Sequence, residues 1–258
     1  MERRPTPWIE ALRHSHDTLA VVVEALDGTQ LRQPSYATEW SVAQVLSHLG
    51  SQADIFALFL EAGLRNEPVP GNEAFGPIWD TWNARTPEEQ ATEWRQAEEA
   101  AVSRFEAVGP EQRASMHLDM FGMAVDFARL VSMRVSEHAL HSWDVAVSLD
   151  PSAQVAADAV TLLVDTLDQL VPRVGKPDGT TRTVHVRTTD PGRRFVLQVD
   201  EAVALAPAPP DDGGAAELHL SAEALVRLVY GRLDAAHTPP YTAVGVDLDE
   251  LRRLFPGL

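Results

Sequence analysis

Apolar side chains recur every three or four residues through much of the first 150 positions. This spacing predicts amphipathic helices that bury one face. Two of these helices have marked starts, because Ser41 with Gln44, and Thr86 with Glu89, form capping boxes. Four long helices in one stretch predict a four-helix bundle. They are expected at about 8–27, 41–60, 87–108 and 121–149.

Two features of this half leave room for alternatives. Residues 64–85 are rich in Pro, Gly, Asn and Trp and are expected to form a long loop. Trp79 and Trp82 in that loop either line a pocket or anchor the loop to the bundle. The charged residues of the third helix, Glu98 among them, predict a solvated outer face. His16 is expected to be an ordinary polar position of the first helix.

The pattern changes in the second half, where apolar and polar residues alternate in two segments. Such alternation predicts half-buried strands, and Asp190-Pro191-Gly192 between the two segments is a turn signal. A fifth helix, capped by Asp150-Pro151, is expected before them. The sequence therefore predicts a bundle over 1–150 and a small α+β domain over 151–258. The expected elements of the second half are a helix at 152–171, strands at 181–188, 194–200 and 217–220, a helix from Ser221 to Gly231, and a helix starting at Asp247.

Composition narrows the possible partners. The 258-residue chain carries a net charge of −17, which argues against nucleic acid and against anionic membrane surfaces. It has no run of 18 apolar residues and no apolar segment near its start that resembles a secretory signal, so a cytoplasmic protein is expected. The chain has no cysteine, so any thiol chemistry must use an external thiol.

The stretch around residue 140 carries candidate chemistry. Glu137 and His141 are four residues apart, so a helix places them on one face, one turn apart. A third ligand has to come from another helix, and His48 is the candidate. Asp144 either orients His141 or is a surface charge, and His138 is expected to lie off the ligand face. Two imidazoles and a carboxylate suit Zn²⁺ first, and also Ni²⁺, Co²⁺, Fe²⁺ or Mn²⁺.

Three segments carry a resemblance to a known family. Residues 39–49 (EWSVAQVLSHL) and 137–144 (EHALHSWD) resemble the two signatures of the DinB-like, mycothiol-dependent maleylpyruvate isomerase family, and 231–234 (GRLD) resembles its second domain. The resemblance implies a DinB-like four-helix bundle followed by a small, sterol-carrier-like α+β domain. It also implies that His48, Glu137 and His141 bind a divalent metal, and that mycothiol, a thiol of actinobacteria, is the cofactor.

The resemblance further implies an enzyme that acts on a small electrophile. Either a cis–trans isomerase or a thiol S-transferase fits, and the sequence does not choose between them. Arg232 is the candidate catalytic residue, binding a substrate carboxylate, although it is equally well interpreted as an arginine that caps the preceding helix. The competing hypotheses are a non-catalytic module that binds a small apolar ligand, and an acidic regulatory protein.

Overall fold

The computed structural model describes residues 5–37, 39–209 and 213–257. The sequence also predicts a loop rich in Pro, Asp and Gly at 207–214, and this loop lies partly outside the described residues. The chain divides into two compact units, Met1–Val155 and Ala156–Leu258, and each is described by itself. The expected boundary was at residue 150.

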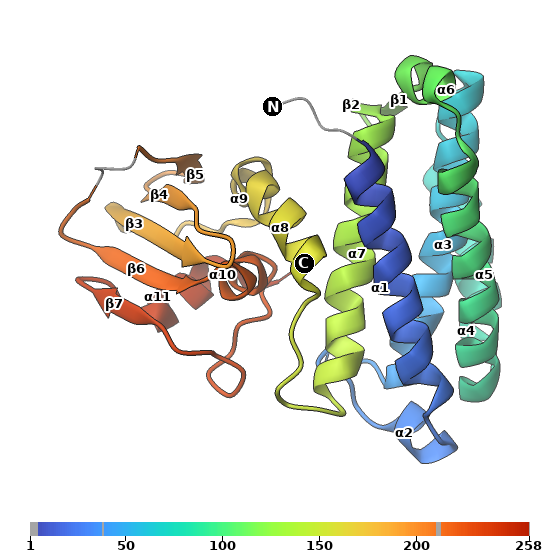
Figure 1. Ribbon diagram of the computed structural model, residues 1–258, viewed down its shortest axis with the longest axis horizontal. Helices are drawn as coiled ribbons and strands as arrows, with labels where there is room; N and C mark the ends of the chain where they lie inside the picture. The colour runs from blue at the N-terminus through green and yellow to red at the C-terminus, as the bar shows by residue number, and fades with distance from the viewer. Residues whose placement is uncertain (1–4, 38, 210–212, 258) are drawn as a thin grey trace. The chain divides into compact units, whose positions relative to one another are not determined.

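The first unit is built on four long helices (Figure 1). Helix α3 packs against α5 and α7, and α1 packs against the same two helices, so the four surround one core. The predicted four-helix bundle is confirmed. The long helices are α1 (Pro5–Glu24), α3 (Val42–Arg65), α5 (Pro87–Ala107) and α7 (Phe127–Val147), and the short ones are α2 (Gly28–Arg32), η1 (Asn72–Ala74), α4 (Gly76–Asn83) and α6 (Pro110–Ser115).

The predicted helix starts are confirmed by their hydrogen bonds. The Ser41 hydroxyl accepts from the backbone N–H of Gln44 at 3.3 Å, and the side chain of Gln44 accepts from the backbone of Ser41 at 2.8 Å. Thr86 and Glu89 make the same reciprocal pair at the start of α5. Each box satisfies backbone donors that a helix start otherwise leaves unpaired.

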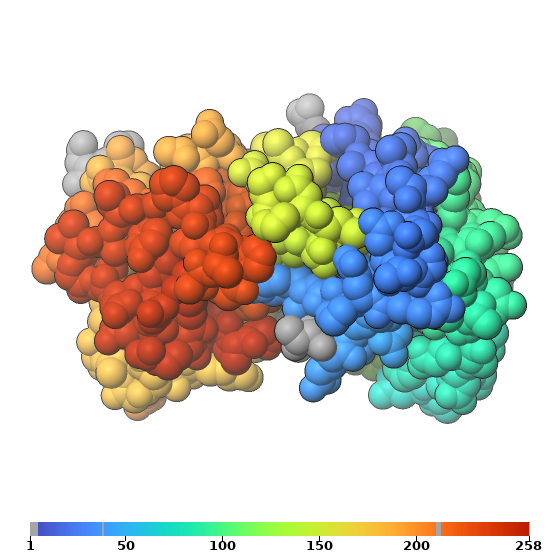
Figure 2. Space-filling view, turned by 90° about the horizontal axis from the view of Figure 1, so that it is seen from below, coloured from blue at the N-terminus to red at the C-terminus, as the bar shows by residue number. Residues whose placement is uncertain are grey.

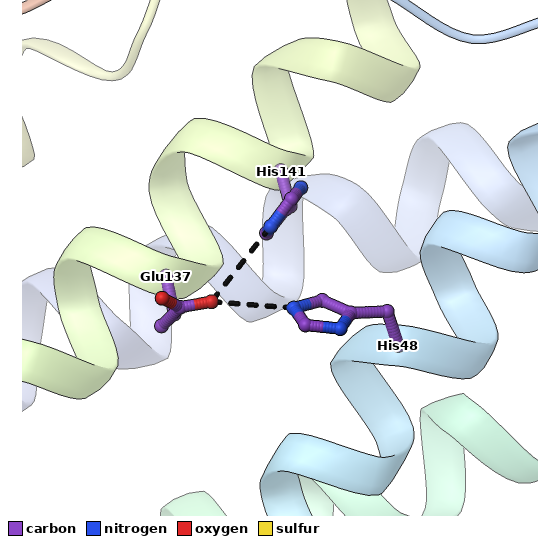
Figure 3. A group of neighbouring side chains, drawn as sticks. All are labelled: His48, Glu137 and His141. Atoms are coloured by element: carbon purple, nitrogen blue, oxygen red, sulfur yellow. Dashed lines mark hydrogen bonds and ion pairs between the residues drawn. The ribbon is translucent and has the colours of Figure 1, made fainter. Parts of the chain in front are cut away.

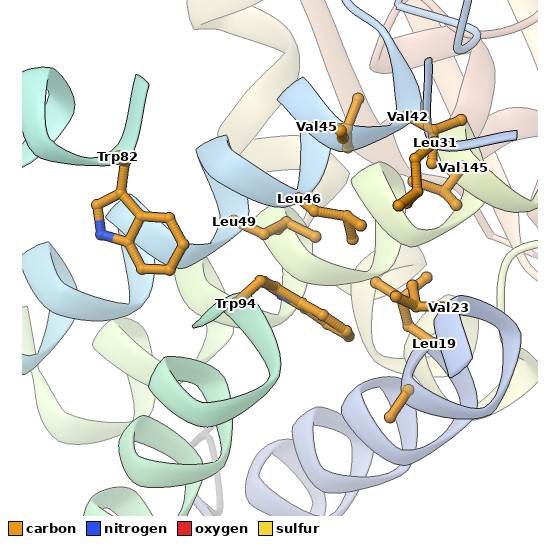
Figure 4. Close-up of a cluster of buried hydrophobic side chains, with 12 residues drawn as sticks. Leu19, Val23, Leu31, Val42, Val45, Leu46, Leu49, Trp82, Trp94 and Val145 are labelled. Carbon is orange, nitrogen blue, oxygen red and sulfur yellow. The ribbon is translucent and has the colours of Figure 1, made fainter. Parts of the chain in front are cut away.

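One cluster of buried apolar side chains joins these helices (Figure 4). Leu46 and Leu49 of α3 face Trp94 of α5, and all three are fully buried. Gly50 lets the ring of Trp82 lie directly against α3, because a Cβ at this position would come within 2.2 Å of that ring. On the outside, the side chains of α1 and α2 (blue) lie beside those of α5 (teal) in Figure 2, as their contacts require.

Three expectations, two for the first half and one for the start of the second, are wrong in detail. Residues 64–85 are not one loop, because α4 forms inside them and Trp82 anchors it in the core. The fourth helix begins at Phe127, because residues 117–126 form a hairpin of β1 (His117–Met120) and β2 (Met123–Asp126). At 152–171 a loop precedes three short helical segments, whose start is determined by packing and by no side-chain cap.

The second unit is a five-stranded sheet with helices packed against it. The strand order is β5-β4-β3-β6-β7, and every neighbouring pair is antiparallel except β3 and β6. Val184 and Val186 of β3 are buried while His185 and Arg187 are half-buried, so the predicted alternation is confirmed. The strands are β3 (Arg182–Thr189), β4 (Arg194–Val199), β5 (Val203–Pro207), β6 (Glu217–Ser221) and β7 (Thr242–Val244).

The helices of this unit contact the sheet chiefly through α9 on β5 and through α10 on β3 and β6. Ser221 caps α10 as predicted, and Gly231, with φ of +69°, ends that segment in the left-handed conformation that favours glycine. The sequence analysis missed β5 and β7. No helix among the described residues is long and apolar enough to cross a bilayer. The helical segments are α8 (Ala157–Leu163), η2 (Val164–Thr166), α9 (Leu167–Val174), α10 (Ala222–Val229) and α11 (Leu248–Leu254).

Candidate metal centre

His48, Glu137 and His141 meet inside the helical unit (Figure 3). Helix α3 supplies His48, and α7 supplies the other two from successive turns of one face. The Glu137 Oε2 atom lies 3.3 Å from Nε2 of His48 and 3.7 Å from Nε2 of His141. One potential ligand atom from each residue falls within 4.8 Å of the others. The fold therefore brings His48, the candidate third ligand, next to Glu137 and His141.

The three side chains are partly open to solvent. The exposed fractions are 22% for His48, 35% for Glu137 and 12% for His141. One side of the cluster is therefore held by the bundle, and the other can be reached from outside. A site that holds an ion through three protein atoms and leaves further positions open is the usual layout of a catalytic metal site.

The protonation of the cluster suits a cation. Burial acts to raise the pKa of Glu137, but the hydrogen bond with His48 and the charge interactions with both imidazoles outweigh it and lower this pKa to about 2. Burial lowers the pKa of His48, and the hydrogen bond with Glu137 offsets only part of that effect. Glu137 is thus ionised and His48 neutral at pH 7, which are the states in which carboxylates and imidazoles bind metals.

Two neighbours shape the cluster. The buried carboxylate of Asp144 accepts a hydrogen bond from Nδ1 of His141 at 2.8 Å, which leaves Nε2 of that ring to face the cluster. Carboxylates that orient metal-bound histidines do so through this contact. The Trp40 ring lies beside both histidines, with centroids 5.0 Å from His48 and 6.0 Å from His141. Trp40 therefore forms an aromatic wall of the cluster.

A second histidine–carboxylate group lies elsewhere on the same unit. His16, Asp17 and Glu99 also bring one potential ligand atom each within 4.8 Å. Here, however, the guanidinium of Arg13 bonds both oxygens of Glu99, at 2.6 and 3.1 Å, and lies 3.6 Å from Asp17. The cationic position of this group is taken by the protein itself. His16 is buried, so its interpretation as an ordinary polar position was wrong.

Arg232 lies in the second unit, Ala156–Leu258. It follows Gly231 directly after α10, and its guanidinium donates a hydrogen bond to the carbonyl of Tyr230 at 3.1 Å. This contact is the one expected of an arginine that caps a helix. The side chain remains half-buried.

The sequence analysis missed a buried group beside the metal cluster. Glu98 of α5 and Arg134 of α7 are fully buried and form an ion pair, so Glu98 does not belong to a solvated face. His138 is also fully buried, and its Nδ1 atom is hydrogen-bonded to the hydroxyls of Ser15 and Ser142. It is not one of the three residues whose potential ligand atoms converge. A signal was present, because Glu98 follows Trp94 by one turn within the buried stripe of α5.

Comparison with known proteins places the chain in a family. No curated protein matches the sequence. A crystal structure of the mycothiol-dependent maleylpyruvate isomerase is similar, with a TM-score of 0.67 and 13% identity over 93% of this chain and 92% of that chain. A variant of that isomerase with one histidine changed to alanine has a TM-score of 0.66 and 12% identity over the same shares of the two chains.

A structure of YfiT from Bacillus subtilis, described as a probable metal-dependent hydrolase, has a TM-score of only 0.45 and 16% identity over 58% of this chain and 89% of that chain. This likeness is too low to support an argument. At 12 and 13% identity the two isomerase structures establish the two-domain α+β fold alone. The family model described as the mycothiol maleylpyruvate isomerase N-terminal domain matches residues 12–146, more than half of the chain. The chain belongs to that family.

Proposed function

We propose that this protein is a metal-dependent enzyme that uses a low-molecular-weight thiol, mycothiol, on a small electrophilic substrate. The observation that carries the proposal is the convergence of His48, Glu137 and His141 on a partly exposed face of the bundle. We propose these three residues as the metal ligands. Family membership and the similarity to the isomerase structures support the thiol and the class of reaction.

The donor set fits a divalent transition metal. Two imidazole nitrogens and one carboxylate oxygen suit Zn²⁺ first and also Ni²⁺, Co²⁺, Fe²⁺ or Mn²⁺. A bound divalent ion would supply a Lewis acid that lowers the pKa of a thiol. Asp144 holds His141 in the tautomer that presents Nε2 to the cluster, and the low pKa of Glu137 keeps that residue anionic.

The nucleophile has to come from outside the chain, because the sequence contains no cysteine. Bound mycothiol would supply a thiolate for reversible addition to a conjugated double bond, which permits cis–trans isomerisation, or for conjugation in an S-transferase. The wall formed by Trp40 restricts the directions from which a substrate approaches the two histidines.

We propose Arg232 as the residue that binds a substrate carboxylate. A chain with a net charge of −17 repels small anions, so an anionic substrate needs a local cation. Arg232→Met should therefore raise KM for a carboxylate substrate and leave metal binding unchanged.

Metal analysis of the purified protein tests the centre. We expect about one divalent ion per chain in the wild type, and its loss in both His48→Ala and His141→Ala. His117→Ala is the matched control, because His117 is exposed on β1 and lies outside the cluster. A wild-type protein that binds neither Zn²⁺ nor Ni²⁺ contradicts the proposal and favours a ligand-binding module.

Assays with mycothiol then separate the two activities. An isomerase converts a cis-configured unsaturated keto acid to the trans form and needs the thiol only in catalytic amount, whereas an S-transferase consumes one thiol for each product. Activity with neither the metal nor the thiol present would contradict the proposed chemistry. Chromatography of the product with a thiol titration gives the stoichiometry.

A further inference from the structure

We propose that Arg134 is a positioning residue for the metal centre and that Glu98 is its counter-ion. The inference rests on the proposed function, because it concerns the same three candidate ligands. It assigns a role to the fully buried ion pair of Arg134 and Glu98, which among the described residues lies beside those candidate ligands.

The side chain of Arg134 on α7 makes hydrogen bonds to both α3 and α5. Arg134 lies on α7, one turn before Glu137. Its Nη2 atom donates a hydrogen bond to the carbonyl of Leu49 on α3 at 3.0 Å, and Leu49 is the residue after His48. The same nitrogen is hydrogen-bonded to Oε2 of Glu98 on α5. A single guanidinium nitrogen therefore ties the helix of His48 to the helix of Glu137.

Such a tie matters because metal sites tolerate little displacement. Ligand distances in protein metal sites hold to within about 0.2 Å. His48 comes from α3 and the other two ligands come from α7, so a small slide of one helix along the other changes the distance between Nε2 of His48 and Oε2 of Glu137. The contact from Arg134 to Leu49 opposes that slide within one residue of His48.

Stability alone is a poor reason for this pair. A buried ion pair is often replaced by apolar side chains of similar size without loss of stability, because the cost of removing both charges from water is large. Here the polar groups are also incompletely paired: Nε and Nη1 of Arg134 and Oε1 of Glu98 have no hydrogen-bond partner among the described residues. Positioning of the adjacent ligands gives the pair a function that apolar residues cannot supply.

The test uses Co²⁺, which reports both affinity and ligand geometry through its visible spectrum. The full-length double variant Glu98→Leu/Arg134→Met removes both charges together and is compared with the wild type. We expect it to remain helical by circular dichroism, to bind Co²⁺ at least tenfold more weakly, and to show a changed spectrum. A purely structural role for the pair would move the melting temperature and leave the spectrum of the bound Co²⁺ unchanged.

The matched control is another buried pair of the same residue types. Glu223 and Arg227 form a buried i,i+4 ion pair on α10, with Nε and Oε1 2.6 Å apart, in the other unit. Glu223→Leu/Arg227→Met should leave the affinity for Co²⁺ and the spectrum unchanged. A loss of binding equal to that of the first double variant would overturn the positioning role.

A milder variant covers the case in which the double variant does not fold. Arg134→Lys keeps a cation beside Glu98, but its single ammonium nitrogen ends one bond before the position of Nη2 and cannot reproduce the planar guanidinium, so we expect at least threefold weaker binding of Co²⁺. Wild-type affinity and spectrum in a folded variant of either kind would overturn the positioning role alone. Failure of the wild-type protein to bind Co²⁺ would overturn the proposed function itself.

Discussion

Two polar groups that share helix α7 differ in their exposure to solvent. His48, Glu137 and His141 are partly exposed, and their potential ligand atoms converge. Glu98 and Arg134 have no exposed side-chain surface and pair with each other. Among the described residues, no arginine or lysine is bonded to the Glu137 carboxylate of the first group, whereas Arg134 supplies a cation within the second group.

The difference shows how a bundle separates a binding group from a structural one. A charge that is closed off from water needs a partner within the protein, since an unpaired buried charge costs several kcal/mol. A charge on a partly exposed face stays hydrated and can be reached by an ion from solvent. The group of His16, Asp17 and Glu99 is a third case, because its carboxylates are exposed and Arg13 already occupies the place that a metal would take.

The largest expected effect comes from leaving the closed group half-complete. Glu98→Leu leaves Arg134 buried without its counter-ion, which should lower the free energy of unfolding by about 3–5 kcal/mol. Urea unfolding followed by circular dichroism measures the change. Glu88→Leu on the same helix is the control, because Glu88 pairs with Arg32 at the surface and should change stability little. Equal losses in the two variants would contradict the comparison.

In the partly exposed group of His48, Glu137 and His141, a substitution should reduce metal binding and leave the stability of the metal-free protein unchanged. Glu137→Gln should weaken Zn²⁺ binding by roughly a hundredfold or more, above the range typical of residues that only orient a ligand. With Zn²⁺ at 100 times the Kd, the wild type should gain about 2.7 kcal/mol of stability, and the variant should lose that gain. Thermal unfolding with and without Zn²⁺ measures both. A variant that unfolds in the absence of metal would show that Glu137 is structural.

A smaller effect is expected from the partner of His141. Asp144→Asn removes the carboxylate that receives the Nδ1–H of His141, so metal affinity should fall by about 10–100-fold. Competition with a chromophoric chelator gives the affinity. Asp54→Asn is the control, since the Asp54 carboxylate also accepts from a ring N–H, that of Trp82, away from the cluster. Unchanged affinity in Asp144→Asn would leave His141 oriented by the helix alone.

The smallest effect concerns the group that Arg13 occupies. The hydrogen bonds from Arg13 lower the pKa of Glu99 to about 2, despite partial burial. This stabilisation is therefore complete above the ordinary pKa of about 4.5 and is lost as the pH falls toward 2. Glu99 is half exposed, so the contribution should stay below about 1 kcal/mol.

Comparison of the wild type with Arg13→Met between about pH 6 and pH 3 measures this contribution. The difference in stability should shrink as the pH falls, and added salt should reduce it at pH 6 because the pair is exposed to solvent. A difference that grows on acidification would contradict the role assigned to Arg13. Addition of Zn²⁺ should not stabilise the His48→Ala variant through this second group.

The local signals for the helices were strong enough to be interpreted without the fold. Capping boxes at Ser41 and Thr86 depend on residues three positions apart, so the sequence alone marks both helix starts. The segments at 121–126 and 152–171 were interpreted wrongly. A short hairpin and an uncapped helix are decided by the packing around them, which periodicity does not report.

The candidate site divides in the same way. The spacing of Glu137 and His141 predicted a shared face, and His48 was the candidate for a third ligand from another helix. The family resemblance implied the same residue. The burial of Glu98 was missed because its helix carries many charged residues, and a single glutamate one turn after Trp94 looks like one more surface charge. Arg134 was missed for another reason, because its partner Glu98 lies 36 residues away in the sequence.

The sequence by itself determined the amphipathic helices, the change to alternating strands, the lack of an internal thiol and the pair of candidate ligands one helical turn apart. These properties depend on residue identity and on contacts within about one helical turn. Only the tertiary structure decided which charges are closed off from water and which remain open. That outcome depends on side chains brought together from α3, α5 and α7, and burial changes the energy of a charge more than any neighbour in the sequence does.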